Sequence, residues 1–434
     1  MIIMVAGLFG GLQGASAADQ PVNLQSLIDQ AKPGDTITVP AGAYQGPIQI
    51  NKTLKLIADQ EVLIHGNGDA PILTIQADHV LIAGIHFVDE RARDPKEATV
   101  LVKGNDNVLK EVTVRTNGTG IQLREASRNL LDGVQIQGLT DARSGSDSVM
   151  RGNGIDLWES YSNQIINSSV DNMYDGIYLE NSSDNLIRSN VAKNSRYGYH
   201  LMFTKNNTIE KNVGFHNVTG AMVMGSEQVK VQHNEFSKQN ENVNSQGILL
   251  FDVKKTAIQG NEVEGNRVGI YVESSSDNQI LNNVLTRNFI GIQMIDASTN
   301  ELEGNEFVSN VIQAQAESSS DNRVQANYWD DMQGIDRTGS GRSDLAYQIN
   351  PFYITLTNDV KAFQLFFGSP GMEFLESLFN NPTDSWLKDR SPLMKPPALQ
   401  GQVEQGVGFS ALWLGLVLLV VSLLCIYNWG IARK

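Results

Sequence analysis

The chain has 434 residues, with 33 Lys and Arg against 48 Asp and Glu, and a formal net charge of −15 at pH 7. Such an acidic balance argues against nucleic acid or a polyanionic sugar as partner, because no basic groove could dominate the field, and it suits a cation or a basic protein surface. The single cysteine, Cys425, excludes an intrachain disulfide.

The first 34 residues predict an exported chain with a capped start. Residues 2–14 are apolar and Gly-rich, and Ala15-Ser16-Ala17 resembles a cleavage site, so we expect a signal peptide at 1–17. Residues 18–34 then form an N-terminal cap, in which VNLQSLIDQAK (22–32) predicts a short amphipathic helix that Pro33-Gly34 ends. Such a helix covers the open end of a repeat structure.

A repeat dominates the middle of the chain. Its mark is a glycine followed by apolar residues at alternate positions, which occurs at Gly154, Gly176, Gly198, Gly220, Gly247, Gly269 and Gly291. The spacing is 22 residues, with one insertion of 5. Because the apolar residues alternate over four or five positions, the pattern favours strands over helices. We therefore expect an all-β fold, a right-handed parallel β-helix over residues 35–330, with excursions near 89–99 and 138–153.

Stacked coils rise by about 4.8 Å, so residues 22 apart lie directly above one another. Two inward columns follow from this spacing. The first is Ile155, Ile177, Tyr199, Ala221, Ile248, Ile270 and Ile292, and the second is Leu157, Leu179, Leu201, Val223, Leu250, Val272 and Met294.

Asparagines recur in the same step, including Asn190, Asn212, Asn234, Asn261, Asn283, Asn305 and Asn327. We expect them at turns, where Asn tolerates the left-handed conformation and its amide can bond the coils above and below. The repeated SSDN segments, with Asp184, Asp277 and Asp321, have the same structural interpretation.

The outward positions of the Gly-led strand are unusually apolar for a solvent-facing surface. They form a stripe from Trp158 to Tyr271, and such a stripe normally marks a binding surface. We expect partner contacts at Trp158, Tyr178, Leu249, Phe251 and Tyr271.

Within the stripe, the period places His200 beside Met222 and Met202 beside Met224. An imidazole with three thioethers favours Cu(I) over zinc or calcium, so these four residues are a candidate site for transient Cu(I), without a resident cofactor. Methionines also suit a flexible protein-docking surface, and that interpretation stays open.

The C-terminal part predicts a cap and a membrane anchor. Residues 331–390 hold two short helical stretches; their apolar residues include Phe363, Phe366 and Phe367, which we expect to meet a membrane-bound partner or to close the last coil. A linker (391–408) leads to 409–430, an uncharged stretch long enough to span a bilayer, followed by Arg433 and Lys434. We expect an extracytoplasmic protein anchored by this span, with its C-terminus in the cytoplasm.

Enzymatic motifs are sparse. The chain has no GxSxG, Walker A, HExxH or CxxC motif. β-Helices often cut or epimerise acidic polysaccharides, so a lyase or epimerase, or a carbohydrate-binding surface protein, remains an alternative. A lyase would release unsaturated uronates, whereas a sugar-binding module would retain glycans without turnover.

Five features of the chain occur in a distinctive order: PGDTITVPAGAYQGPIQINKTLKLIAD (33–59), RGNGIDLWESYSNQI (151–165), the 22-residue coils, NYWDD (327–331) and NPFY (350–353). Together they resemble the NosD family of β-helix proteins in nitrous oxide reductase maturation. The resemblance implies a non-catalytic partner of an ABC transporter (NosY-like permease, NosF-like ATPase). It also implies passage of copper, or a sulfur species, from a NosL-like chaperone to the apo-reductase. Family members are soluble periplasmic proteins, so the expected anchor is a departure.

Overall fold

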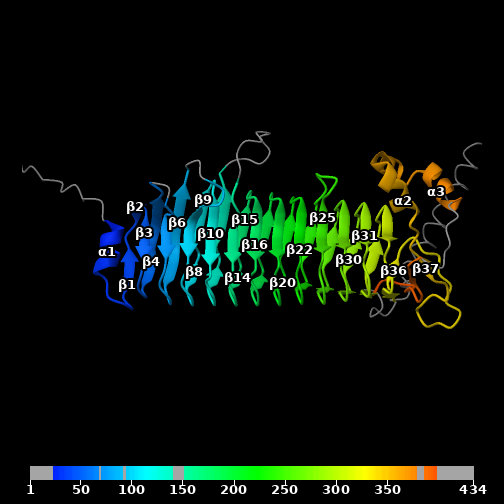
Figure 1. Cartoon of the computed structure of the whole chain (residues 1–434), viewed down its shortest axis with the longest axis horizontal. Coiled ribbons are helices and arrows are strands. Elements are labelled where there is room, and N and C mark those ends of the chain that lie inside the picture. Colours follow the sequence, from blue (N-terminus) through cyan, green and yellow to red (C-terminus); the bar gives the residue numbers. More distant parts are fainter. Residues whose placement is uncertain (1–22, 68–69, 91–93, 140–150, 379–385, 398–434) are drawn as a thin grey trace, which may run out of the picture.

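The structure is a computed structural model that describes residues 23–397, except 68–69, 91–93, 140–150 and 379–385 (Figure 1). The expected signal peptide (1–17) and membrane span (409–430) lie outside the described residues, as does most of the linker. Among the described helices, none is both long and apolar enough to cross a bilayer.

The coils stack into one right-handed parallel β-helix, as the sequence predicts. One strand of each coil belongs to a 12-stranded sheet, which we call the Gly-led sheet because the repeated glycine lies in six of its strands and directly before a seventh, β13. Its strands are β3 (Ile48–Ile50), β5 (Leu73–Ile75), β7 (Ala98–Val102), β10 (Thr119–Arg124), β13 (Ile155–Trp158), β16 (Asp175–Glu180), β19 (Tyr197–Met202), β22 (Thr219–Met224), β25 (Gln246–Phe251), β28 (Val268–Glu273), β31 (Ile290–Ile295) and β34 (Ile312–Glu317).

The remaining coil strands form a 24-stranded sheet that wraps the other sides. They are β1 (Thr36–Val39), β2 (Gly42–Gln45), β4 (Lys55–His65), β6 (Leu81–Asp89), β8 (Val108–Lys110), β9 (Thr113–Thr116), β11 (Leu130–Asp132), β12 (Gln135–Gly138), β14 (Gln164–Ile166), β15 (Ser169–Asp171), β17 (Leu186–Arg188), β18 (Val191–Lys193), β20 (Thr208–Glu210), β21 (Val213–Phe215), β23 (Lys230–Gln232), β24 (Glu235–Ser237), β26 (Ala257–Gln259), β27 (Glu262–Glu264), β29 (Gln279–Leu281), β30 (Val284–Thr286), β32 (Glu301–Glu303), β33 (Glu306–Val308), β35 (Arg323–Gln325) and β36 (Tyr328–Trp329).

The register confirms both inward columns. Ile155 pairs with Ile177 and Leu157 with Leu179, and the same step continues through β34. All fourteen residues of the two columns are at most 1% exposed. A column of stacked aliphatic side chains buries apolar surface at every rung, which contributes about 25 cal/mol per Å² removed from water.

The repeated glycine is required by how closely successive coils approach. A Cβ at Gly176 would lie 2.4 Å from the carbonyl oxygen of Gly198, and one at Gly220 would lie 2.5 Å from that of Gly247. Real Cβ atoms do not come so near a backbone oxygen. Any side chain here would therefore push two coils apart.

The asparagine ladder is confirmed, but the backbone conformation that we expected for it is wrong. The side-chain oxygen of Asn207 accepts from the backbone N–H of Asn185 at 2.8 Å and from its Nδ2 at 3.2 Å. The left-handed residue is instead the one before each ladder asparagine, such as Asp184 (φ 61°) and Ser189 (φ 57°). The asparagine itself turns inward, where its amide bonds two neighbouring coils and is 2% exposed or less at Asn185 and Asn190.

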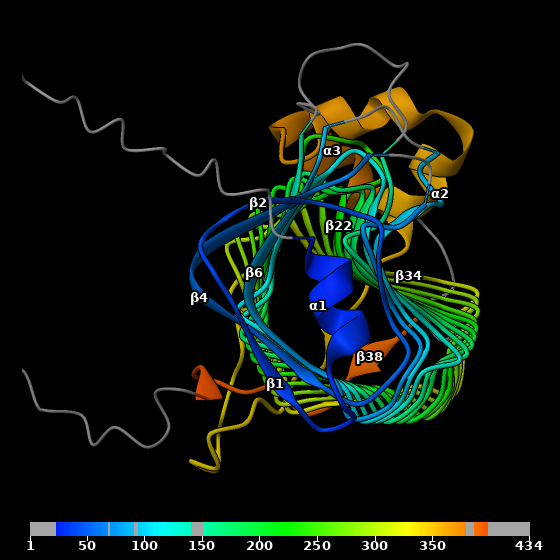
Figure 2. The ribbon, with the colours of Figure 1, turned by 90° about the vertical axis from the view of Figure 1, so that its left-hand side faces the viewer.

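The N-terminal end is covered by helix α1 (Leu24–Gln30), as the sequence predicts. Asn23 caps it by accepting from the N–H of Ser26. Leu24 and Ile28 are buried against the first coil, and Figure 2 shows α1 lying over the opening of the coils.

At the other end, the last coil is closed by stacked aromatic rings and a returning strand rather than by the helices that we expected to close it. Trp329 stacks between Phe307 (4.2 Å) and Tyr347 (4.3 Å). Strand β37 (Tyr347–Gln348) pairs with β38 (Lys388–Asp389). Asp389 ends the ladder, because its carboxylate accepts from the backbone and side-chain amides of Asn327.

The C-terminal helices are α2 (Phe352–Asp359), the 3₁₀ helix η2 (Lys361–Phe366) and α3 (Pro370–Ser377). In Figure 2, α2 and α3 lie outside the outline of the coils. They join the Gly-led sheet through a small apolar cluster of Val268, Ile290 and Ile312, against which Phe367 and Tyr353 pack. The helices therefore cover the last part of one lateral face.

We predict that Asn234→Ala lowers the free energy of unfolding by about 2 kcal/mol, measured by chemical denaturation. Asn234 is 2% exposed, accepts from two amide groups of Asn212 and donates to Ile209 and Asn261. The control is Asn240→Ala, an exposed residue with one side-chain bond, to the carbonyl of Gly265, whose change should stay within about 0.5 kcal/mol. Equal losses for both variants would contradict a stabilising ladder.

Candidate metal and partner site

The outward stripe lies in one register across successive strands of the Gly-led sheet. His200 pairs with Met222 and Met202 with Met224, so the four candidate metal ligands occupy two adjacent rungs, as the period predicts. On the preceding rung, Tyr178 pairs with His200. Adjacent rungs are about 4.8 Å apart, which leaves room for an imidazole and thioethers to converge.

A carboxylate holds the imidazole ring of His200 in place. Its Nδ1 lies 2.8 Å from Oδ2 of Asp175, a residue that is 1% exposed. Asp175 begins strand β16, one residue before Gly176, so it reaches His200 from the neighbouring coil. Because a carboxylate accepts hydrogen bonds, Nδ1 carries a proton, and in the neutral ring the other nitrogen, Nε2, then presents its lone pair.

An arginine and three tyrosines complete this surrounding. Arg196 donates from Nε and Nη2 to the two oxygens of Asp175, at 2.8 and 2.7 Å. Its guanidinium stacks on Tyr174 at 3.9 Å and on Tyr197 at 4.2 Å. Tyr178 and Tyr197 also flank the His200 ring, with centroids 4.8 and 4.9 Å away.

The charged and titratable groups of this cluster stabilise one another. Burial alone would raise the pKa of Asp175, but hydrogen bonds from His200 and Arg196 outweigh it and hold that pKa below its ordinary value. Burial, with help from Glu180, which accepts from the hydroxyl at 2.9 Å, raises the pKa of Tyr178. At neutral pH the carboxylate is ionised and the phenol is protonated.

The feature that stands out chemically is Nε2 of His200. It is buried and has no hydrogen-bond partner among the residues that the structure describes. A buried unsatisfied nitrogen costs free energy, so such a group calls for an explanation. A histidine whose other nitrogen donates to a carboxylate is the usual form of a metal ligand, because the carboxylate fixes the ring and raises its basicity.

The chemistry of the side chains on these two rungs decides which metal they suit. No group of three or more His, Cys, Asp and Glu side chains within the described ranges could hold a metal ion. The side chains on the same and the next rung are the half-buried Met202, Met222 and Met224. One imidazole with thioethers suits Cu(I), which favours soft ligands, and does not suit calcium or magnesium.

The other stripe residues lie along the same columns and are half-buried. Trp158 lies one rung before Glu180, Leu249 follows Met222, and Phe251 follows Met224. Tyr271 follows Leu249; its hydroxyl donates to Glu273 at 2.8 Å, and it packs against the same apolar cluster as Phe367 and Tyr353. The surface is therefore contiguous, and its role in partner binding stays a prediction.

The three phenylalanines of the C-terminal segment separate into two kinds. Phe363 and Phe366 are 37% and 56% exposed, and Leu365 beside them is 84% exposed. Phe367 instead stacks on Phe289 at 5.6 Å and meets Tyr353 edge-on, so it fastens the helices to the sheet. The first two remain candidates for a partner contact.

Asp175 and Arg196 are the site residues that the sequence interpretation missed. Only the second and fourth positions after each glycine are predicted to face outward. The position before the glycine also belongs to an outward column, in which Asp175 pairs with Tyr197 and Tyr197 with Thr219. An acidic residue in that column is therefore the sequence signal from which the carboxylate could have been predicted.

We predict that Asp175→Asn destabilises the protein by about 2 kcal/mol at pH 7, because it removes the negative charge and one of the two acceptor oxygens that serve Arg196 and His200. The depressed pKa of Asp175 contributes stability above its unfolded value of about 3.9, and this is lost as the pH falls through the folded value. The melting temperatures of wild type and variant should therefore converge below about pH 4. Asp171→Asn, which removes a more exposed ion pair with Lys193, is the control. A constant difference at all pH values would contradict the assignment.

Two comparisons concern the family. A family model described as periplasmic copper-binding protein (NosD) matches residues 133–338. The probable ABC transporter binding protein NosD of Stutzerimonas stutzeri is 29% identical over 417 residues, which cover 91% of each chain.

Solved structures agree on the fold. The A-module of the Azotobacter vinelandii mannuronan C-5 epimerase AlgE6 has a TM-score of 0.54 at 15% identity, over 70% of this chain and 93% of its own. The Yersinia enterocolitica family 28 exopolygalacturonase has a TM-score of 0.53 at 12% identity, over 69% and 74%. At such low identity these likenesses show a shared β-helix and nothing of the chemistry. The resemblance to the NosD family is confirmed by the family model and by the Stutzerimonas stutzeri relative.

Proposed function

We propose that this chain is a non-catalytic maturation factor that works with an ABC transporter to supply copper, or a sulfur species, to nitrous oxide reductase. The proposal rests on the resemblance to the NosD family, whose model carries a copper-binding description and whose Stutzerimonas stutzeri relative is named for an ABC transporter. It places the β-helix outside the cytoplasm, attached to the membrane through residues 409–430.

The copper part of the proposal rests on the unpartnered Nε2 of His200, a residue on the two rungs that also carry the three methionines, which we call the methionine rungs. Asp175 and Arg196 would hold the imidazole, and the thioethers of Met202, Met222 and Met224 would complete a soft site. Copper is cargo in this scheme. Neutral thioethers bind Cu(I) without proton release, which suits an ion that must be taken from a NosL-like chaperone and given to the apo-reductase.

The exposed part of the C-terminal helices suits the transporter. Phe363, Leu365 and Phe366 on η2, with Phe374 and Leu375 on α3, expose large apolar side chains close together in the sequence. Apolar helical surfaces of this kind bind hydrophobic grooves of partner proteins. We therefore assign this surface to a NosY-like permease.

One observation favours the alternative of a lyase or epimerase: a buried His and Asp pair with tyrosines nearby could move protons. Two features weigh against it. His200 is only 5% exposed, which leaves little access for a polymer. Arg196 already pairs with both oxygens of Asp175, so most of its charge is neutralised before a uronate could bind.

We predict that the full chain binds Cu(I), and that changing Met202, Met222 and Met224 together to Leu weakens binding by at least about tenfold. Leu preserves apolar volume while removing the sulfur lone pairs. The affinity is measured by competition with a chromophoric Cu(I) chelator under anaerobic conditions. Met394→Leu is the matched control, because Met394 is 36% exposed and lies in the segment that follows β38. An unchanged titration in the triple variant would remove this site.

We also predict that Phe366→Ser combined with Leu365→Ser abolishes co-purification with the ABC permease, because it removes exposed apolar contact area without touching the coils. Phe203→Ser, at an aromatic residue that is 55% exposed on a coil corner, serves as control and should leave recovery of the permease unchanged. The same variants are then assayed for copper in the reductase. Full recovery of the permease with the double variant would contradict the docking surface.

A further inference from the structure

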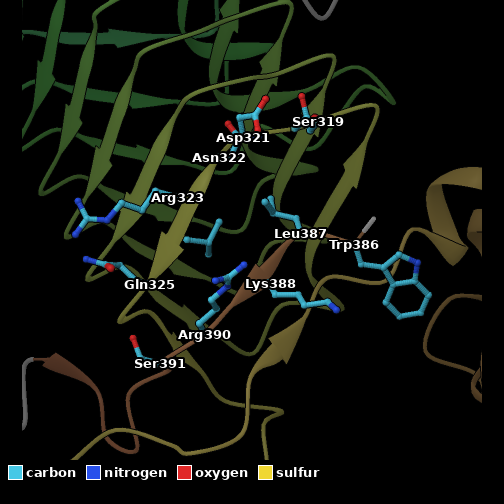
Figure 3. Close-up of a pocket in the computed structure, with 12 residues that line it drawn as sticks. Ser319, Asp321, Asn322, Arg323, Gln325, Trp386, Leu387, Lys388, Arg390 and Ser391 are labelled. Atoms are coloured by element: carbon cyan, nitrogen blue, oxygen red, sulfur yellow. The ribbon is translucent and has the colours of Figure 1, made fainter. Parts of the chain in front are cut away.

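A hollow of about 880 Å³ lies between the last complete coil and the returning segment near the C-terminal end (Figure 3). One wall is the coil segment 319–325, and the other is the segment from Trp386 to Ser391. The size is that of a typical small-molecule site. It lies apart from the methionine rungs, and the proposed function makes no use of it.

The wall formed by the return segment is held rigidly. Asp389 is fully buried, and its carboxylate accepts from the N–H and Nδ2 of Asn327 at 2.9 and 3.1 Å and from Nε1 of Trp329 at 3.2 Å. Because side chains alternate along a strand, Lys388 and Arg390 face the side opposite to Asp389. The hydrogen bonds of a buried neighbour therefore fix the two cations.

The charge of the hollow is opposite to that of the chain. Lys388 and Arg390 form no ion pair with any residue that the structure describes, and Asp321 is the one acidic side chain in the lining. Arg323 also lines the hollow but already pairs with Glu301 at 2.7 Å. In a chain of net charge −15, two unpaired cations in a concave site indicate an anionic ligand.

The remaining lining favours a sugar. Trp386 borders this hollow and a second one of about 310 Å³, and its indole N–H is buried without a hydrogen-bond partner in the described part of the chain. An indole offers an apolar face to a sugar ring and a donor to a hydroxyl. Ser319, Asn322 and Gln325 on the coil wall already bond within the coils, to Glu317, Asn300 and Glu303, so the contacts left for a ligand are those of Lys388, Arg390 and Trp386.

We propose that this hollow binds a short acidic oligosaccharide, whose acid groups pair with Lys388 and Arg390 and one of whose rings lies against Trp386. The acidic balance of the chain argues against a long polyanion, and that argument still holds outside the hollow. Charges more than about 8 Å away are largely screened at physiological salt, so the local cations govern a ligand of two or three sugars.

The test is calorimetric titration of the purified full chain with trigalacturonate, a phosphorylated maltotriose and neutral maltotriose. We expect one or both acidic sugars to bind and the neutral one to bind at least tenfold more weakly; the two acidic arms distinguish carboxylate from phosphate. Lys388→Gln with Arg390→Gln should reduce binding at least tenfold, and Trp386→Ala should reduce it separately. Lys230→Gln, at an exposed lysine on a middle coil, is the control.

Three results would overturn the proposal: neutral and acidic sugars binding equally, unchanged binding by the double variant, or tighter binding of a glutamate-rich peptide than of either sugar. Unfolding curves of the variants exclude a general loss of structure. Copper(I) affinity is measured on the same samples, and it should stay unchanged, so failure here and failure of the maturation role are distinguishable.

Discussion

The structure depends on coils that lie in phase at the closest distance that a polypeptide allows. A Cβ at the repeated glycine would meet the next coil's carbonyl oxygen at 2.4–2.7 Å, so the absence of a side chain there sets the spacing. The asparagine amides then join neighbouring coils at 2.8–3.2 Å. Both devices recur in the coils from Gly154 to Gly291, and together they oblige each side chain there to stand above the one before it.

Such alignment lets residues far apart in sequence form one site. The His200 cluster draws Asp175 and Tyr178 from one coil, Arg196, Tyr197 and His200 from the next, and Met222 from a third. No special loop is needed to bring these residues together, because the spacing between adjacent strands already places them close to one another. Substituting side chains in columns can thus bring candidate ligands together on a rigid sheet, with no change of backbone.

The sequence predicts what the period controls and little of what packing controls. The inward columns, the pairing of His200 with Met222 and the asparagine ladder all follow from a step of 22 residues. The burial of His200 does not, because it arises from the rings of Tyr178 and Tyr197 on neighbouring rungs. Nor does the period show that α2, η2 and α3 cover a lateral face, since this depends on contacts of Phe367 and Tyr353 with Val268, Ile290 and Ile312, which lie far earlier in the chain.

The position of those helices constrains any coupling between a transporter and the methionine rungs. The outward column runs from His200 through Met222 and Leu249 to Tyr271, which packs toward the cluster that holds the helices. Three rungs separate His200 from Tyr271, or about 14 Å at the spacing of parallel strands. A rigid sheet transmits displacement over such a distance without repacking, because its ladder bonds leave few soft degrees of freedom. A permease that moved η2 and α3 would therefore displace Tyr271 together with the rungs beside it, and would leave the inward core packed as it is.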